Sequence, residues 1–538
     1  MTGHPEVALT PLGGVGEFGR NVLWLSCGDS NILVDVGVSF PDETFPGIDR
    51  IAPDLSAIRS LSIDAVLLTH GHEDHVGALP LLGEWCDAPV YALPFTVALA
   101  RRRLEEAGLS ARLTEARTGE RVQAGAFAFT FFRVSHSVPD SAALLIEAGG
   151  LRIFHSGDFK LDPDPPDGET TDVAGITASV GDGVDLALVD STNAERPGHA
   201  LSEREAGRGL AEAFAGAPGR IILTTFSSHV ARISQAVEAA TSGGRRVAML
   251  GRSMRTVAEI AERFGRLRIP SSSRIASGEL QGVPPSRVLC LTSGSQGEPF
   301  SALYRLALDE HADLKLQRGD LVLFSSRTIP GHERSVNRVT DHLVRRGARV
   351  LRETEPPIHV SGHAHAEDLA DWLRMLKPRA VVPIHGEVRM LAAAAQVARD
   401  VGVAPDRIPL LDNGDRVLLS GEGVRVERGA VATGKIFLDS RPEAVDLDIV
   451  RDRRRLAEEG FIVVFVHDRE ISVVSRGVAR DEAGLAGEIS RAAKEVLDRA
   501  TVEESTDVDW LRSEIALAAK RVCRREFGIR PVIVPVIV

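Results

Sequence analysis

His70-Gly71-His72-Glu73-Asp74-His75 packs three imidazoles and two carboxylates into six positions, directly after the apolar run at residues 65–68. In an extended segment alternate side chains share one face, so we expect His70 and His72 to converge on one metal ion. Three histidines and an aspartate at this spacing should recur by chance in only on the order of one chain per thousand. The stretch therefore predicts a strand that ends in a metal site.

Asp74 and His75, in the second half of this stretch, are predicted to serve a second ion. A helix is expected to begin at Val76, which places both side chains at its N-terminal edge, beside the first site. Two ions about 3.5–4 Å apart would clamp the attacking and leaving oxygens of a displacement reaction. The stretch thus indicates a hydrolase with a binuclear centre.

Bulk properties place the chain among ordinary globular proteins. Its 538 residues exceed one hydrophobic core and predict about three domains. We expect no membrane partner and a cytoplasmic location, because no apolar run approaches the ~20 residues of a membrane span and the first residues lack a signal region. The net charge of −12 is summed over the whole chain, so it argues only weakly against a polyanion partner. Metal ions and local arginines can still make one cleft positive.

Cysteine chemistry is not expected to contribute. The four cysteines lie far apart in the sequence and form no CxxC pair. A disulfide framework and a thiolate zinc site are therefore not indicated. The metal ligands must be histidines and carboxylates.

A glycine-rich corner at residues 14–19 matches the pattern GxGxxG, with Asp35 downstream where an acidic ribose partner would lie. A dinucleotide fingerprint requires a helix after the glycines. Here residues 22–24 lead into a second strand instead. We therefore assign the corner to a turn and Asp35 to a strand end, where its carboxylate would orient a ligand or a loop.

The pattern of apolar runs divides the chain. Strands and helices alternate in residues 1–202, a parallel α/β texture follows in residues 203–352, and strands return in residues 353–432, with runs at 358–360 and 380–384 around a helix at 366–376. Residues 433–447 are expected to be a linker. A small α+β domain is predicted for residues 448–538, and its apolar, proline-bearing end is expected to form an edge strand or a partner contact.

A binuclear site needs more donors than the hexapeptide supplies. His136, Asp158 and His385 each follow a strand in a loop rich in glycine or serine, where small neighbours let the backbone approach an ion. We expect His136 to join the first pair of histidines, His385 to join the second pair of ligands, and Asp158 to bridge both ions. The predicted metal ligands are His70, His72, Asp74, His75, His136, Asp158 and His385.

This succession of motifs resembles the metallo-β-lactamase superfamily, which implies an αββα sandwich. The large inserted α/β region, followed by the final ligand, is similar to the β-CASP nuclease branch of that superfamily. The further motifs of that branch match Asp190, His363 and His385. Relatives that act on RNA carry a histidine at the last motif, so His385 favours RNA over DNA.

Within that branch the chain resembles the ribonuclease J family over nearly its whole length. The likeness rests on residues 12–17, 292–299 and 325–331 and on the C-terminal α+β domain. One departure is Ala231, which stands in the loop at residues 226–232 where the family has an aromatic residue or histidine. Residues 162–183, rich in proline, glycine and aspartate, look like an enlarged loop.

The resemblance implies a ribonuclease of RNA processing and decay. Such an enzyme degrades RNA in the 5′-to-3′ direction from a 5′-monophosphate end and also cuts internally. Two Zn²⁺ ions are expected to acidify a bridging water to about pKa 7, and the resulting hydroxide attacks the phosphodiester. Ligands of this type also accept Mn²⁺.

The resemblance also assigns roles to single residues. Asp74 is expected to act in catalysis, and His363 to stabilise the transition state or to protonate the leaving oxygen, with Asp190 orienting its ring. Hydroxyls, an imidazole and backbone N–H groups suit a terminal phosphate dianion. The predicted phosphate and RNA contacts are Ser228, His229, Ser361, Gly362 and His363.

Single-stranded RNA is the expected partner, with a homodimer or homotetramer and a helicase of RNA decay as further partners implied by the resemblance. Three alternatives stay open. A β-CASP DNA nuclease would use the same site. A small-molecule thioester or lactone hydrolase would leave the inserted domain unexplained, and a non-catalytic RNA-binding subunit would not need all seven metal ligands.

Overall fold

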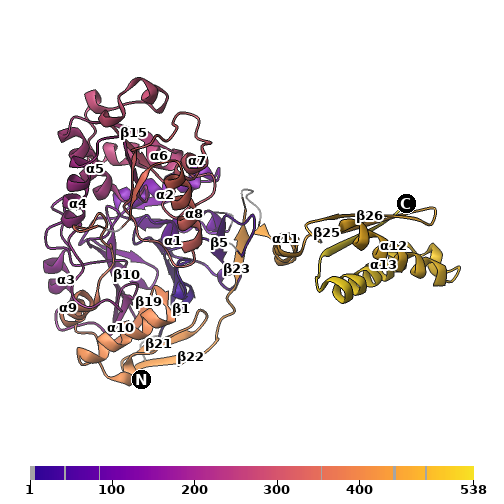
Figure 1. Cartoon of the computed structure of the whole chain (residues 1–538). Coiled ribbons are helices and arrows are strands. Elements are labelled where there is room, and N and C mark those ends of the chain that lie inside the picture. The colour runs from indigo at the N-terminus through magenta and orange to yellow at the C-terminus, as the bar shows by residue number, and fades with distance from the viewer. Residues whose placement is uncertain (1–5, 42–43, 84, 353, 440–443, 479–480) are drawn as a thin grey trace. The chain divides into compact units, whose positions relative to one another are not determined.

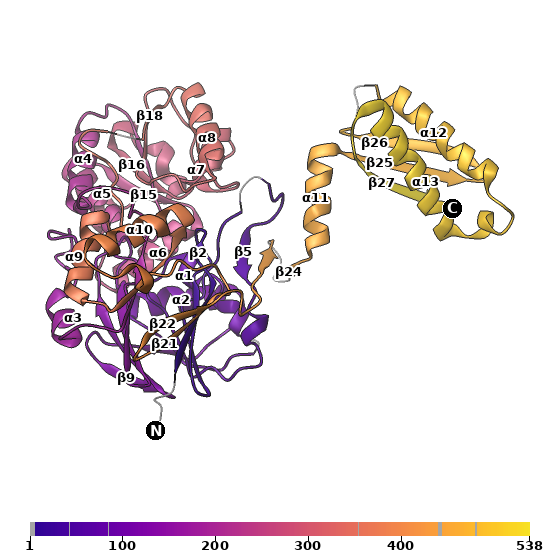
Figure 2. The same ribbon diagram turned by 90° about the horizontal axis from the view of Figure 1, so that it is seen from below.

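The computed structural model describes residues 6–41, 44–83, 85–352, 354–439, 444–478 and 481–538. The chain forms two compact units. Unit 1 comprises residues up to 39 and residues 52–435, and unit 2 comprises residues 40–51 and 436–538. Figures 1 and 2 show the elements of each unit.

Unit 1 contains two mixed sheets that face each other. The first has the strand order β22 (Gly423–Glu427), β21 (Arg416–Ser420), β1 (Val7–Gly13), β3 (Val22–Cys27), β4 (Ser30–Val34), β6 (Ala65–Leu67), β7 (Val90–Ala92) and β8 (Leu113–Glu115). The second has the order β19 (Ala380–Ile384), β13 (Leu186–Asp190), β12 (Leu151–His155), β11 (Ala142–Ala148), β10 (Phe127–Arg133) and β9 (Arg121–Ala124). The late strands β19, β21 and β22 thus complete two sheets whose other strands come from the first 190 residues.

Apolar side chains fill the space between the two sheets. Leu9, Leu25, Phe129 and Ile146 belong to this core and are almost fully buried. Alternation along each strand sends every second side chain inward and the others to the outer face. The outer face of the second sheet is covered by α3 (Val173–Val180), α9 (Ala366–Leu376) and α10 (Val388–Asp400). This is the αββα sandwich that the sequence predicts.

The inserted region forms a sheet of its own. All five strands are parallel, in the order β15 (Arg246–Leu250), β16 (Val288–Thr292), β14 (Ile221–Thr224), β17 (Leu321–Phe324) and β18 (Arg349–Leu351). Helices connect these strands, as parallel pairing requires. The connecting helices are α5 (Val230–Ser242), α6 (Arg252–Arg263), α7 (Ala302–Leu308) and α8 (Glu333–Arg345), and α4 (Glu203–Ala215) precedes β14.

Unit 2 is the predicted small α+β domain with some additions. Its sheet has the order β26 (Glu470–Arg476), β25 (Phe461–His467) and β27 (Val532–Ile537), and α12 (Glu482–Arg499) and α13 (Val508–Val522) pack on one face. The apolar end of the chain is an edge strand, as expected. The residues expected to be a linker include β23 (Lys435–Leu438) and β24 (Ala444–Val445), which form a sheet with β5 (Arg50–Pro53) and precede α11 (Leu447–Glu459).

The helix expected from Val76 is displaced. It begins earlier, as the short α1 (Glu73–Val76), so Asp74 and His75 lie within it. The carbonyl of Asp74 accepts a hydrogen bond from the backbone N–H of Asn21, and that of His75 accepts one from Val36. Because these carbonyls are engaged outside the helix, the helix does not continue.

Two further expectations about local structure are wrong. The apolar run at residues 358–360 is not a strand, because the carbonyls of Ile358 and Val360 accept hydrogen bonds from the side chain of Arg232. The segment at residues 162–183 is not entirely a loop, because α3 lies within it and begins with an N-cap bond from Gly175 to Asp172. In both places a side chain contact decides the backbone conformation.

We expect the buried Phe154 to stabilise unit 1 strongly. Its ring packs 5.8 Å from that of Trp372, which also stacks on Phe159 at 4.3 Å. Phe154→Ala should lower the free energy of unfolding by about 3–5 kcal/mol because it leaves a cavity. The same substitution at Phe300, which is 79% exposed, should cost less than about 0.5 kcal/mol. Urea titration followed by intrinsic fluorescence would measure both, and equal effects would contradict the proposed core packing.

Candidate metal centre

The chemistry-bearing side chains meet at one edge of the sandwich because they all follow strands. The hexapeptide follows β6, Asp190 is the last residue of β13, and loops after β10, β12 and β19 supply the other groups. Strands that end at the same edge deliver their terminal side chains to one place. The residues delivered in this way are His136, Asp158, Asp190 and His385.

Four side chains form the first donor group. The ring nitrogens of His70 (Nε2) and His72 (Nδ1) are 3.0 Å apart, and that of His136 (Nε2) lies 3.3 Å from His72. An oxygen of Asp158 lies 3.5 Å from His70 Nε2 and 3.9 Å from His136 Nε2. All four donor atoms lie within 4.8 Å of one another. Such a set of three nitrogens and one oxygen suits a divalent cation.

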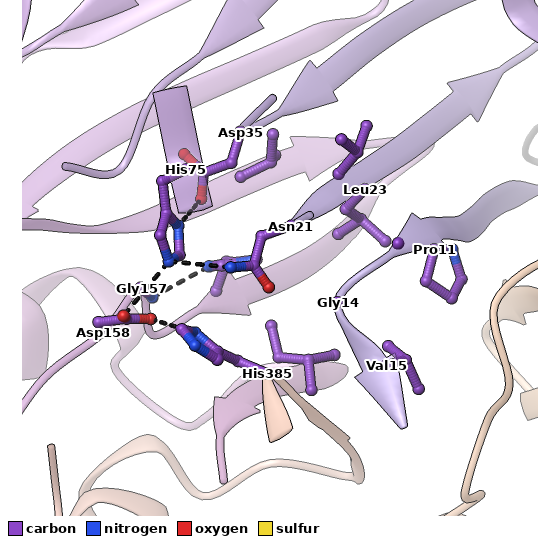
Figure 3. Close-up of a pocket in the computed structure, with 15 residues that line it drawn as sticks. Pro11, Gly14, Val15, Asn21, Leu23, Asp35, His75, Gly157, Asp158 and His385 are labelled. Carbon is purple, nitrogen blue, oxygen red and sulfur yellow. Dashed lines mark hydrogen bonds and ion pairs between the residues drawn. The ribbon is translucent and has the colours of Figure 1, made fainter. Parts of the chain in front are cut away.

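A second donor group shares the same aspartate. Asp158 Oδ2 lies 3.3 Å from His75 Nε2, and its other oxygen lies 2.6 Å from His385 Nδ1. Asp74 Oδ2 lies 3.5 Å from His75 Nε2 and 3.6 Å from His385 Nε2. The close-up in Figure 3 shows the rings of His75 and His385 both turned toward Asp158. The structure thus brings the seven side chains together in the two groups that the sequence predicts.

Hydrogen bonds behind the histidines fix which nitrogen carries the proton. Thr69 donates its hydroxyl hydrogen to Asp35 at 2.8 Å, so the Thr69 oxygen accepts from His70 Nδ1 at 3.0 Å. Asp35 also accepts from His75 Nδ1 at 2.8 Å, and the Gly362 carbonyl accepts from Nδ1 of His136, again at 2.8 Å. In each ring the opposite nitrogen therefore presents a lone pair to the donor group, as metal-binding histidines require.

Burial keeps the histidines of the first group in their neutral form. Burial, together with neighbouring imidazoles, lowers the pKa of His70 and His136 well below the ordinary value. Burial also lowers the pKa of His72 to about 4, against the opposing pull of Asp74 and Asp158. Neutral imidazole is the form that binds a metal ion. The donor set therefore fits a cation at neutral pH.

The second group is rich in carboxylates and has the opposite balance. Burial acts to lower the pKa of His75 and His385, but Asp158 and other carboxylates outweigh it, raising that of His75 well above normal and that of His385 to about 9. Burial also opposes ionisation of Asp158, yet His385, His75 and His70 hold its pKa well below normal. Positive charge is thus stabilised at this place, whether it comes from protons or from a cation.

Two residues of the site have a left-handed backbone conformation. Asp35 has φ 60° and His385 has φ 54°. A non-glycine residue adopts this region at a cost that the surrounding structure must offset, and such residues gather at functional sites. Here the offset is visible, because Asp35 accepts two hydrogen bonds from Thr69 and one from His75.

The glycine-rich corner supports the second donor group. Its strand β2 (Val15–Gly16) pairs in parallel with β20 (Gly386–Glu387), which directly follows His385. Gly14, at φ 86°, leaves no room for a side chain, since an added Cβ would lie 2.2 Å from the Asn21 side chain. Asn21 in turn donates to the Asp74 carbonyl at 3.0 Å and lies 3.1 Å from His75 Nε2. The corner is therefore part of the scaffold of this site.

A histidine and aspartate pair adjoins the metal-binding groups. His363 Nδ1 lies 2.8 Å from the buried carboxylate of Asp190 and 4.0 Å from Asp158. Burial lowers the pKa of His363, but the charge and hydrogen bond of Asp190 outweigh burial and raise it. The ring is thereby oriented and held toward its protonated form.

Comparison with known proteins agrees with this geometry. Models of protein families match four parts of the chain: a beta-lactamase superfamily domain at residues 30–251, the ribonuclease J beta-CASP domain at 218–343, a Zn-dependent metallo-hydrolase RNA specificity domain at 354–406 and the ribonuclease J C-terminal domain at 448–538. Ribonuclease J of Thermus thermophilus is 37% identical to this chain over 100% of the chain and 96% of the relative. The chain belongs to the ribonuclease J family.

Other relatives extend the comparison. Ribonuclease J of Mycobacterium tuberculosis is 37% identical over 98% of this chain and 97% of its own length. Ribonuclease J of Helicobacter pylori is 35% identical over 87% of the chain and 68% of the relative. A solved structure of a protein of unknown function from Enterococcus faecalis has a TM-score of 0.56 at 17% identity, covering 77% of this chain and 100% of that one. This last likeness concerns the fold alone.

As a ribonuclease J family member, the chain is a metallo-hydrolase of the nuclease type. The metallo-hydrolase domain and the cluster of histidines and aspartates together indicate a divalent metal site. Among the described residues, no helix is both long and apolar enough to cross a membrane.

The side chains predicted to bind phosphate lie in two segments. Ser361 accepts hydrogen bonds from Asn193 at 2.7 Å and from the His363 backbone at 3.2 Å. Ser228 and His229 precede α5, and His229 is almost fully buried with Nδ1 unpartnered among the described residues. Burial, followed by the charges of Arg232 and Lys160, lowers the pKa of His229 well below normal.

Several residues that support the site in this ribonuclease J family member could not be identified from sequence patterns. Arg232 is fully buried and binds Glu203 with two hydrogen bonds of 2.6 and 2.8 Å, while its remaining N–H groups reach the carbonyls before Ser361. No fixed spacing relates these partners, so only the tertiary structure reveals them. The others are Thr69, Asn21 and Asn193.

We expect Asp35→Asn to weaken metal binding by 10- to 100-fold, because the amide cannot accept both the Thr69 hydroxyl and the His75 N–H. Bound metal measured against a competing chelator would report the change. Asp164→Asn, at a carboxylate that is 64% exposed and paired with Arg204, is the matched control. Equal affinities for both variants and the wild type would contradict the orienting role of Asp35.

Proposed function

We propose that the chain is a metal-dependent ribonuclease that degrades single-stranded RNA in the 5′-to-3′ direction, prefers a 5′-monophosphate end and also cuts internally, in RNA processing and decay. The observation that carries this proposal is the pair of donor groups sharing Asp158. Membership of the ribonuclease J family supports RNA as the substrate.

Two Zn²⁺ ions are proposed as the cofactors, and Mn²⁺ is an alternative that the same ligands accept. His70, His72 and His136 would hold one ion, and Asp74, His75 and His385 the other. Asp158 would bridge them, since its Oδ2 atom lies 3.5 Å from His70 Nε2 in the first group and 3.3 Å from His75 Nε2 in the second. When bound, such ions supply positive charge to a phosphate and acidify a water molecule.

The protein's own groups then have distinct tasks. Asp74 keeps 31% of its side chain exposed, so its outer oxygen is available to accept a proton from a nucleophilic water. The His363 ring, raised in pKa by Asp190, would stabilise negative charge on the phosphate or protonate the leaving oxygen. Asp190 acts through His363 by fixing its tautomer.

Recognition of the 5′ phosphate is proposed for the loops around the centre. Ser228 and His229 contribute from the start of α5, and Ser361, Gly362 and His363 contribute from the other segment. Gly362 is required to be small, because a Cβ there would lie 2.9 Å from His136 Nδ1. Backbone N–H groups in such a turn suit a phosphate dianion.

Association and location are proposed from family membership. We propose a homodimer or homotetramer assembled through the C-terminal domain, a helicase of RNA decay as a partner and a cytoplasmic location. The family match to the C-terminal domain covers residues 448–538.

The decisive test is one labelled RNA prepared with a 5′-monophosphate, a 5′-triphosphate or a 5′-hydroxyl end, beside single-stranded DNA of the same sequence. The wild type should release mononucleotides fastest from the monophosphate RNA, because the hydroxyl end has no terminal phosphate and the triphosphate end is longer and more highly charged than a pocket for one phosphate accepts. Asp74→Ala should abolish release. Equal internal cutting of all RNAs would refute the exonuclease claim, and preferential cutting of DNA would favour a DNA nuclease.

The role of His363 has its own test. His363→Asn should lower kcat on RNA by about 10²- to 10⁴-fold, the usual contribution of a general acid or base. Asp190→Asn should lower kcat by a smaller factor, since the ring is present but poorly oriented. Metal content should stay at the wild-type level in both variants. Loss of metal in step with activity would show that the pair acts on the metal site instead.

A further inference from the structure

Two arginines, Arg196 and Arg327, gather around Asn193 next to the catalytic segment. Arg327 donates from Nη1 to the Asn193 side-chain oxygen at 2.9 Å, and the Arg196 backbone N–H donates to the Asn193 carbonyl, also at 2.9 Å. Asn193 then donates to Ser361 Oγ at 2.7 Å and to the His363 carbonyl at 3.4 Å. Both arginines are exposed.

Neither guanidinium forms an ion pair with a carboxylate in the described part of the chain. Among the residues that the structure describes, no carboxylate lies within 4.0 Å of Arg196 or Arg327. Glu195, the acidic residue nearest in sequence, is paired with Arg389, which also binds Glu387 at 2.7 Å. Burial lowers the pKa of Arg327, and the charges of Arg196 and Arg389 lower it further, against a smaller opposing effect of Glu195. Positive charge therefore accumulates here despite the negative charge of the whole chain.

The backbone of Arg327 is held in place by a second loop. Gln296 donates to the Arg327 carbonyl at 2.9 Å and accepts from the Ile329 N–H at 2.8 Å, and its own N–H donates to Glu298 at 3.0 Å. These residues belong to the segments at 292–299 and 325–331, which the metal centre does not use. The hydrogen bonds between these two segments hold the backbone of Arg327 in a fixed position.

A fixed, exposed guanidinium beside a second one, with no described carboxylate in ion-pair contact, is suited to a phosphate. The planar fork binds two phosphate oxygens at once, and pre-ordering reduces the entropy lost on binding. A lone structural role does not explain this arrangement, because like charges held together without a partner repel each other. A polyanionic ligand would remove that repulsion.

We propose that Arg196 and Arg327 bind a backbone phosphodiester of the RNA strand, at a subsite separate from the phosphate at the metal centre. The subsite is separate because Asn193 and the backbone of residues 361–363 lie between Arg327 and the metal-binding groups. The proposal rests on the proposed function, since it takes RNA as the ligand. Asn193 is the positioning residue that links this subsite to Ser361 and His363.

Salt dependence of binding tests the proposal. Each phosphate contact to a single strand contributes about 0.7 to the slope of log K against log salt concentration. Binding of a labelled 5′-hydroxyl RNA would be measured in the Asp74→Ala background, where the strand is not cut. Because the two arginines share one phosphate, the double variant should reduce the slope by about 0.7, and Arg196→Ala and Arg327→Ala should each reduce it by part of that amount. Arg327→Lys keeps the charge and should keep the slope.

Arg121→Ala is the matched control for charge. Arg121 is 58% exposed and lies on β9, at the edge of the second sheet opposite β19. It should leave the slope unchanged. A wild-type slope in the Arg196 and Arg327 variants would overturn the proposal. A loss of affinity confined to RNA with a 5′-monophosphate would also overturn it, because the arginines would then bind the terminal phosphate.

The binding readout separates this proposal from the proposed function. If the wild type fails to hydrolyse RNA with Zn²⁺ or Mn²⁺ present, the ribonuclease proposal fails. The slope measurement does not depend on cleavage, so a reduced slope would still support an RNA-binding subsite. Full hydrolysis with unchanged slopes in all variants would leave the ribonuclease proposal standing and remove the subsite.

Discussion

The buried carboxylate of Asp158 is the group on which the rest of the site depends. It lies between four histidines that come from three different loops, and its Oδ2 atom faces both donor groups. Burying such a charge is costly unless it is paired. The fold meets this cost by surrounding the carboxylate with groups that are either cationic or able to bind a cation. The same requirement explains why the neighbouring histidines are fixed by Thr69 and Asp35 from behind.

The inserted domain is joined to this site by hydrogen bonds from one buried arginine. Arg232, in a helix of the insertion, binds Glu203 and also holds the carbonyls of the segment that leads to Ser361 and His363. Removing one partner of a buried pair leaves an uncompensated charge, at a cost of about 3–5 kcal/mol. The Arg232 side chain therefore fixes the path of the backbone that leaves the insertion. This path in turn positions the catalytic segment.

Much of this architecture could be predicted from the sequence, because it depends on short-range patterns. Alternation in the strand before His70 fixes which side chains converge, and the recurrence of polar residues after apolar runs locates His136, Asp158 and His385. Their roles as ligands stay predictions, although the structure brings them together. The failures have the opposite cause. The absent strand at residues 358–360 and the early end of α1 both reflect hydrogen bonds to groups far away in sequence, for which local propensity carries no information.

The position of His385 after the inserted domain has a consequence for how the protein is made. Synthesis proceeds from the N-terminus, and domains fold as they emerge. The first donor group is complete once Asp158 has emerged, whereas the second waits for 227 further residues. Under the proposed function, a nascent chain on the ribosome therefore has only one of the two donor groups that cleavage requires. The messenger from which it is being translated is exposed to a finished nuclease only after most of the chain has been read.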